Sequence, residues 1–168
     1  MVRATRYVVI SILAIIWLVW RCPAGFADGS IPYWGRALSY SFFHASIWHL
    51  AANCVAAWSL LVPRRKGLLK DMLFAYIIAV LVFPLSLRPV IGFSNLLYAL
   101  CGLWTPPLNS PWWKKTEVVI FLAVTLAMLF IPRVSGLTHI LAFLAGMAIA
   151  MSRRWIVKNL QDAERFIK

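Results

Sequence analysis

Gly92-Phe93-Ser94-Asn95-Leu96-Leu97-Tyr98-Ala99-Leu100-Cys101-Gly102 is the stretch of sequence that decides the fold. A glycine and a polar pair open it and an apolar run follows, which predicts a membrane helix from Ser94 to Trp104. About eleven helical residues are roughly 16 Å long, whereas the hydrocarbon core of a bilayer is about 30 Å thick. One end of this helix must therefore lie below the membrane surface. A serine in its first turn is most often a small packing residue, so its meaning depends on the rest of the chain.

The composition places the chain among integral membrane proteins. Of its 168 residues, 62% are hydrophobic and the mean hydropathy is +0.81, against roughly 45–50% apolar residues in soluble domains. The net charge of +12 would suggest nucleic acid in a soluble protein, but here the cations flank apolar runs, so membrane topology explains them and we expect no nucleic-acid partner. Cys22, Cys54 and Cys101 lack metal-ligand spacing, and we expect neither metal nor cofactor.

Apolar runs separated by proline, glycine and charged residues predict an all-α, polytopic bundle. The expected six transmembrane helices cover residues 7–20, 41–62, 71–85, 94–104, 116–131 and 136–151. They form one membrane domain, residues 1–152, and residues 153–168 form a basic cytoplasmic tail that could be a short amphipathic helix. The loop over residues 21–40 is the longest connection.

The first apolar run has a second interpretation, a signal peptide cleaved near Ala24-Gly25-Phe26-Ala27. Bulky Trp17 and Trp20 at its end suit a membrane anchor better, so we retain it as a helix.

The distribution of cations predicts the orientation. With both termini cytoplasmic, thirteen of the seventeen Lys and Arg residues lie on the inner side, in agreement with the positive-inside rule. The outer loops carry the other four, Arg21, Arg36, Arg88 and Arg133. A plasma or bacterial inner membrane fits this topology.

Ser94 then lies at the outer end of the short helix, below the outer surface, and the loop over 84–93 must dip into the membrane. Irregular backbone survives at that depth when it is buried in protein or lines a wet cavity, so we expect a water-filled pocket with Ser94 near its floor.

Four polar side chains from three expected helices fall at a similar depth in the outer half of the bilayer. Ser94 and His139 begin their helices, and His49 lies about two turns into its own, with Asn53 on the same face at i+4. Hydrogen bonding between helices, with no catalytic role, is the alternative explanation for such groups. Their convergence favours an active site, in which His139 takes the proton of Ser94 and His49 and Asn53 donate to an oxyanion. The backbone N–H of Ser94, at a helix N-terminus, could join these donors.

No carboxylate can complete a triad from within the membrane, because all five acids lie in loops, helix ends or the tail. We therefore expect a Ser–His dyad, with the imidazole oriented by packing against an aromatic such as Tyr98, at i+4 from Ser94. His44, about 140° around a helix from His49, is expected to be a structural hydrogen-bonding residue outside the pocket. Close approach of the two helices is predicted by small residues, Gly102 on one and Ala142, Gly146 and Ala150 on the other.

These motifs resemble the rhomboid family of intramembrane serine proteases. The segment from His44 to Asn53 is similar to the family's second-helix motif, a histidine followed by His and Asn four apart. The segment Gly92-Phe93-Ser94-Asn95 is similar to its nucleophile motif, and Thr138-His139 with Gly146 to its sixth helix. The order and spacing agree over nearly the whole chain.

The resemblance implies that Ser94 is the nucleophile and His139 the general base, that His49 and Asn53 form the oxyanion hole, and that Tyr98 packs on His139. It also implies that the substrates are transmembrane segments of other proteins, cleaved near the membrane surface without metal or cofactor. The partners are then these substrates and the lipid bilayer.

Three departures from the family pattern affect the surroundings of the catalytic groups. Asn95 follows the serine where glycine is usual, Leu141-Ala142 replaces small residues, and Trp34-Gly35-Arg36 replaces a contiguous Trp-Arg. None removes a catalytic group, so an active enzyme is favoured. Two alternatives remain: an inactive relative that binds transmembrane helices, and a haem- or metal-binding subunit using His44, His49 and His139. The i, i+5 spacing of the first two histidines disfavours shared ligation.

Overall fold

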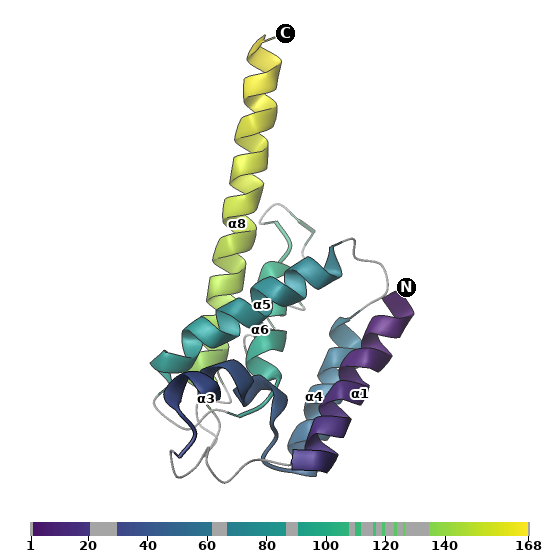
Figure 1. The fold of residues 1–168 in the computed structure, drawn as a ribbon. Coiled ribbons are helices and arrows are strands. Elements are labelled where there is room, and N and C mark those ends of the chain that lie inside the picture. The colour runs from purple at the N-terminus through teal and green to yellow at the C-terminus, as the bar shows by residue number, and fades with distance from the viewer. Residues whose placement is uncertain are drawn as a thin grey trace.

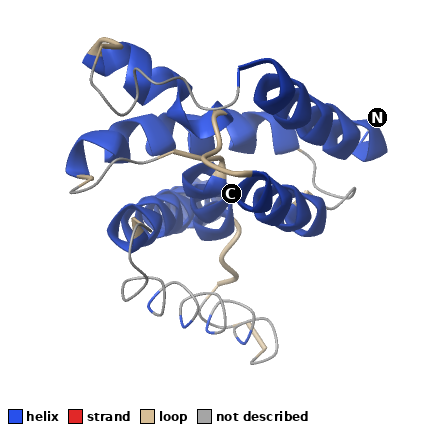
Figure 2. Cartoon of the chain, turned by 90° about the horizontal axis from the view of Figure 1, so that it is seen from below, coloured by secondary structure: helices blue, strands red, loops and turns tan. Residues whose placement is uncertain are grey.

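The computed structural model describes residues 2–20, 30–61, 67–86, 91–107, 110–111 and 135–167, and the single positions 116, 119, 123 and 126. The described chain is helix and loop with no strand (Figure 2), as expected for an all-α protein. The expected helix over 116–131 lies almost wholly outside the described residues. So do the basic cluster at 64–66, the candidate cleavage site at 24–27 and part of the loop before Ser94, residues 87–90.

Helices near the expected positions make up the described bundle. In chain order they are α1 (Val2–Trp20), α3 (Tyr33–Ser39), the 3-10 helix η1 (Tyr40–Phe42), α4 (Ile47–Leu60), α5 (Leu68–Val82), the 3-10 helix η2 (Phe83–Leu85), α6 (Ser94–Leu103) and α8 (Gly136–Ile167). Helices α1 and α4 lie side by side, α6 lies against α8, and α5 packs on both α6 and α8 (Figure 1). The start of α1 and the end of α8 point to the same side of the bundle (Figure 1).

The second expected helix starts later than predicted, at Ile47 and not at Ser41. Ser46 is the N-cap: its backbone is extended, and its side-chain oxygen accepts a hydrogen bond from the N–H of His49 at 3.1 Å. A short helix, α3, also forms within what was expected to be a loop. His49 is therefore in the first turn of α4, not two turns in.

Helix α8 is longer than expected and continues through the expected boundary between residues 152 and 153 to Ile167. Two of the described helices have segments long and apolar enough to cross a membrane, Leu68–Leu85 and Gly136–Arg165. Tyr7–Val19 and Ser94–Leu103 are shorter apolar helices. Since α8 has 32 residues, it extends roughly 48 Å and exceeds the thickness of the hydrocarbon core.

Glycines bring the backbones of α6 and α8 together. A Cβ atom at Gly102 would lie 2.1 Å from the carbonyl oxygen of Phe143, and one at Gly146 would lie 2.3 Å from that of Ala99. Neither position has room for any side chain. The predicted close approach through small residues is confirmed, and Ala142 and Ala150 of the same stripe are buried.

A polar cluster joins α5, α6 and α8 at the end of the bundle opposite Ser94. The Trp104 indole N–H donates to Asp71 at 2.9 Å, and Arg153 donates to the other carboxylate oxygen at 3.3 Å. The Arg153 guanidinium also lies 4.3 Å from the centre of the Phe74 ring. This cluster fixes α8 where its charged extension begins.

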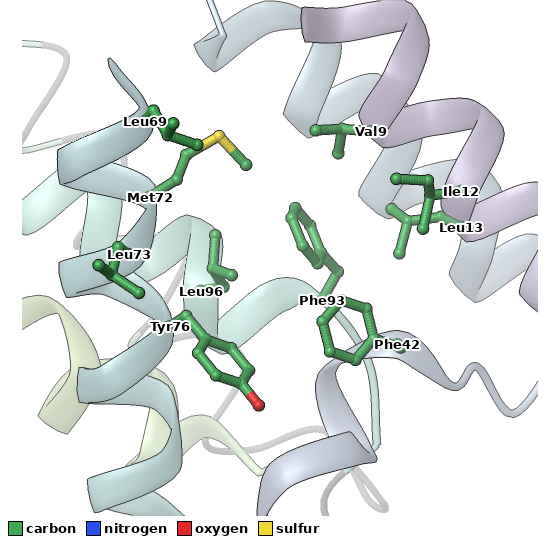
Figure 3. A pocket seen from close by; sticks show the side chains of 10 residues that line it. All are labelled: Val9, Ile12, Leu13, Phe42, Leu69, Met72, Leu73, Tyr76, Phe93 and Leu96. Atoms are coloured by element: carbon green, nitrogen blue, oxygen red, sulfur yellow. The ribbon is translucent and has the colours of Figure 1, made fainter. Parts of the chain in front are cut away.

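An apolar cavity of about 260 Å³ separates α1 from α5. Ile12 and Leu13 line one side and Met72 and Tyr76 the other, and Phe93 projects into the space between them (Figure 3). Phe93 directly precedes Ser94, so the backbone that leads to Ser94 is anchored among apolar side chains.

Candidate active site

Ser94 and His139 meet at the contact between α6 and α8. Ser94 is the first residue of α6 and His139 lies in the first turn of α8. The Ser94 Oγ and the His139 Nε2 are 2.8 Å apart, within hydrogen-bond distance. Ser94 and His139 are 45 residues apart in the sequence. The glycine contacts between α6 and α8 bring the first turns of the two helices side by side.

Tyr98 orients the imidazole. Its ring stacks on that of His139 with centroids 4.5 Å apart and an interplanar angle of 13°. The other ring nitrogen, Nδ1, is buried and has no hydrogen-bond partner among the described residues. In the described part of the chain the site is thus a serine and a histidine, with an aromatic face in the place where a triad has a carboxylate. A neutral imidazole with its proton on Nδ1 leaves Nε2 free to accept the serine proton.

His49 and Asn53 of α4 lie against Gly92, in the backbone that leads to Ser94. A Cβ atom at Gly92, two residues before Ser94, would lie 2.5 Å from His49 Cε1 and 3.3 Å from Asn53 Nδ2. The glycine, with φ of +122°, lets the backbone lie directly on both side chains. The Asn53 amide nitrogen is buried without a described partner, so it is a donor available to a ligand.

His44 is not where the sequence placed it. The angular separation from His49 assumed one continuous helix, but His44 precedes α4 and lies outside any helix. Its buried ring packs edge-on against His49, with centroids 5.2 Å apart. Neither ring nitrogen has a partner within strict hydrogen-bond geometry, but the backbone of Phe42 lies close enough to interact with the ring. The structural hydrogen bond expected for His44 therefore stays a prediction. His44 supports the imidazole of His49 by packing. The described residues contain no group of three metal-ligating side chains around this histidine pair.

Tyr40 is the residue of this region that the sequence analysis did not identify. Its carbonyl oxygen accepts from the N–H of Gly92 at 2.9 Å, and its hydroxyl accepts from Asn95 at 3.1 Å. Nothing in the local sequence shows that the partners of Tyr40 lie about fifty residues later. The unusual Asn95, a polar residue in an apolar helix, was the available signal, since a buried amide needs a partner.

Comparison with known proteins identifies the family. The rhomboid domain model matches residues 30–155, which is most of the chain and includes every site residue above. The chain belongs to the rhomboid family. No curated protein and no solved structure matches it. With its apolar helices, family membership makes it an integral membrane protein, related to intramembrane proteases.

Proposed function

We propose that this protein is an intramembrane serine endopeptidase that cleaves transmembrane segments of other membrane proteins. The single observation that carries the proposal is the 2.8 Å contact between Ser94 Oγ and His139 Nε2. Two further features support it. Tyr98 fixes the plane of the imidazole, and the amide of Asn53 lies beside the backbone that leads to the serine.

In the proposed reaction Ser94 Oγ attacks the scissile carbonyl carbon while its proton passes to His139 Nε2. The carbonyl oxygen becomes an oxyanion that accepts hydrogen bonds from His49, Asn53 and the backbone N–H of Ser94, a group left unpaired at the start of a helix. The C–N bond then breaks as Nε2 gives its proton to the leaving amine. Water attacks the acyl-enzyme carbonyl while His139 Nε2 takes one of its protons. As the ester C–O bond breaks, Nε2 returns this proton to Ser94 Oγ, and the product leaves as a carboxylic acid that ionises in water.

The topology proposed for this enzyme has six membrane spans with both termini cytoplasmic, in a plasma or bacterial inner membrane. The thirteen cations on the inner side support it. In this orientation Ser94 faces the outer half of the bilayer, and a water-filled pocket open to the outside supplies the hydrolytic water. The substrates are single membrane helices reached through the bilayer, and the reaction needs no metal or cofactor.

The decisive test compares the wild-type protein with Ser94→Ala in liposomes that contain a model transmembrane substrate. We expect the wild type to cut the substrate and to be labelled on Ser94 by a fluorophosphonate, and the variant to do neither. Equal cutting by both proteins would refute the assignment. A wild-type protein that binds the substrate helix but is neither labelled nor active would identify an inactive, helix-binding member of the family.

The oxyanion role of Asn53 gives a graded prediction. Replacing Asn53 by alanine is expected to lower kcat by about 100- to 1,000-fold, the usual effect of losing one oxyanion donor. The neighbouring Cys54→Ala is the matched control, because this half-buried free thiol is the next residue on the same helix and takes no part in the proposed reaction. Steady-state cleavage of the model substrate measures both. A loss smaller than 10-fold in Asn53→Ala would assign the oxyanion to other donors.

A further inference from the structure

Two hydrogen bonds to Tyr40 enclose the nucleophile segment, residues 92–95. The carbonyl oxygen of Tyr40 accepts from the N–H of Gly92 at 2.9 Å, two residues before Ser94. The hydroxyl oxygen of the same tyrosine accepts from the Asn95 side-chain amide at 3.1 Å, one residue after Ser94. Ser94 is thus held from both sides by a residue that is far away in the sequence.

The direction of these bonds is set by the third partner of Tyr40. Its hydroxyl donates its only proton to the carbonyl oxygen of Ala79 on α5, at 2.8 Å, because a carbonyl can only accept. The hydroxyl oxygen must then act as acceptor toward Asn95, which fixes the amide nitrogen toward Tyr40. The chain Asn95 to Tyr40 to Ala79 therefore connects α6 through the first loop to α5.

Burial makes this connection stiff. Tyr40 and Asn95 both have an exposed fraction of 0%. No water can replace a lost partner there, so each bond is expensive to break. The Tyr40 ring is also packed against Phe83, with centroids 5.0 Å apart, which limits its rotation. The segment from Gly92 to Asn95 then has little freedom to shift relative to His49 on one side and His139 on the other.

We propose that Tyr40 and Asn95 are positioning residues that hold Ser94 at the correct distance from His139 and from the oxyanion donors. The inference rests on the proposed function. Neither residue touches the reacting atoms; both act through the backbone of residues 92–95. A displacement of about 1 Å in such a site costs on the order of 100-fold in rate, so loss of the tie lowers kcat and leaves substrate binding unchanged.

Tyr40→Phe and Asn95→Ala, with the double variant, test the proposal. Each single variant is expected to lower kcat, and the rate of fluorophosphonate labelling of Ser94, by at least 10-fold, with KM unchanged. The double variant should lose less than the product of the two single effects, since both remove the same bond. Tyr76→Phe is the matched control: its hydroxyl also ties α5 to the first loop, by donating to the Leu38 carbonyl at 2.6 Å, but has no bond to the nucleophile segment.

Amide hydrogen exchange measures how firmly the hydrogen bonds to Tyr40 hold residues 92–95, and it does not require activity. The peptide that contains Gly92 should exchange at least 10-fold faster in Tyr40→Phe and Asn95→Ala than in the wild type, and unchanged in Tyr76→Phe. Unchanged exchange and unchanged kcat in the two variants would overturn the positioning role, as would equal effects from Tyr76→Phe. If the wild type neither cuts nor labels, the protease assignment fails separately, and hydrogen exchange still decides whether Tyr40 and Asn95 order the segment.

Discussion

The His139→Phe variant is expected to lose at least about 1,000-fold in kcat, because general acid–base catalysis contributes about 100- to 10,000-fold and here also activates the nucleophile. Phenylalanine keeps a flat ring that can stack on Tyr98, where the present ring centroids are 4.5 Å apart. The change therefore removes Nε2 and retains the packing of α6 against α8. Circular dichroism and the unfolding temperature should remain close to those of the wild type, which separates lost chemistry from lost structure.

The double variant Ser94→Ala/His139→Phe sharpens this prediction. Residues that act as one catalytic unit have non-additive effects, so the double variant should be no slower than Ser94→Ala alone. Leu137→Ala supplies the control, since this exposed residue is two positions before His139, on another face of α8, and should retain wild-type kcat. Substantial cleavage by His139→Phe would mean that another base serves Ser94 and would remove the dyad from the mechanism.

The features that the sequence predicted well depend on local signals. The expected helix from Ser94 to Trp104 agrees within one residue with α6, which ends at Leu103. The glycine and the polar pair before an apolar run mark its start, and Thr105-Pro106-Pro107 marks its end. The contact of Ser94 with His139 follows from two helices that begin on the same side and approach through Gly102 and Gly146, all visible as patterns.

The features that were missed depend on competition between signals or on distant partners. The apolar run from Ser41 contains a cap, Ser46, whose hydrogen bond with the N–H of His49 starts α4 six residues later than hydrophobicity alone suggests. For that reason His44 lies before the helix and not on one of its faces. No local pattern connects Tyr40 with Asn95, because 55 residues separate them and only the folded chain brings them together.

Asn95 shows how an apparent defect in a motif can be compensated. Asn95 follows Ser94 at the position where the family resemblance leads one to expect glycine. In the structure this side chain is fully buried and bonded to Tyr40, and the Ser94 to His139 distance is still 2.8 Å. The departure in sequence is therefore compatible with an intact dyad, and its partner was the information that one sequence could not supply.

Gly146→Ala is expected to lower the free energy of unfolding by about 3 kcal/mol or more, at the upper end of the usual cost of overpacking. The added Cβ atom would lie 2.3 Å from the Ala99 carbonyl oxygen and 2.9 Å from the Leu103 amide nitrogen, both backbone atoms of α6. Neither atom can rotate away as a side-chain end would. Helix α6 must therefore move away from α8 as a body, which breaks the packing along the whole contact.

Helix propensity predicts the opposite sign for the effect of Gly146→Ala on the free energy of unfolding. By propensity alone, glycine to alanine inside a helix stabilises by about 1 kcal/mol, and the reverse change at exposed Ala148 should destabilise by the same amount. A large destabilisation by Gly146→Ala beside a small one by Ala148→Gly can come only from the collision with α6. Thermal unfolding in mild detergent measures both.

Because the same displacement separates Ser94 from His139, fluorophosphonate labelling of Gly146→Ala below its unfolding temperature should fall by about 100-fold. A stabilised variant with normal labelling would show that the two helices adapt, and that their close contact does not set the geometry of the dyad.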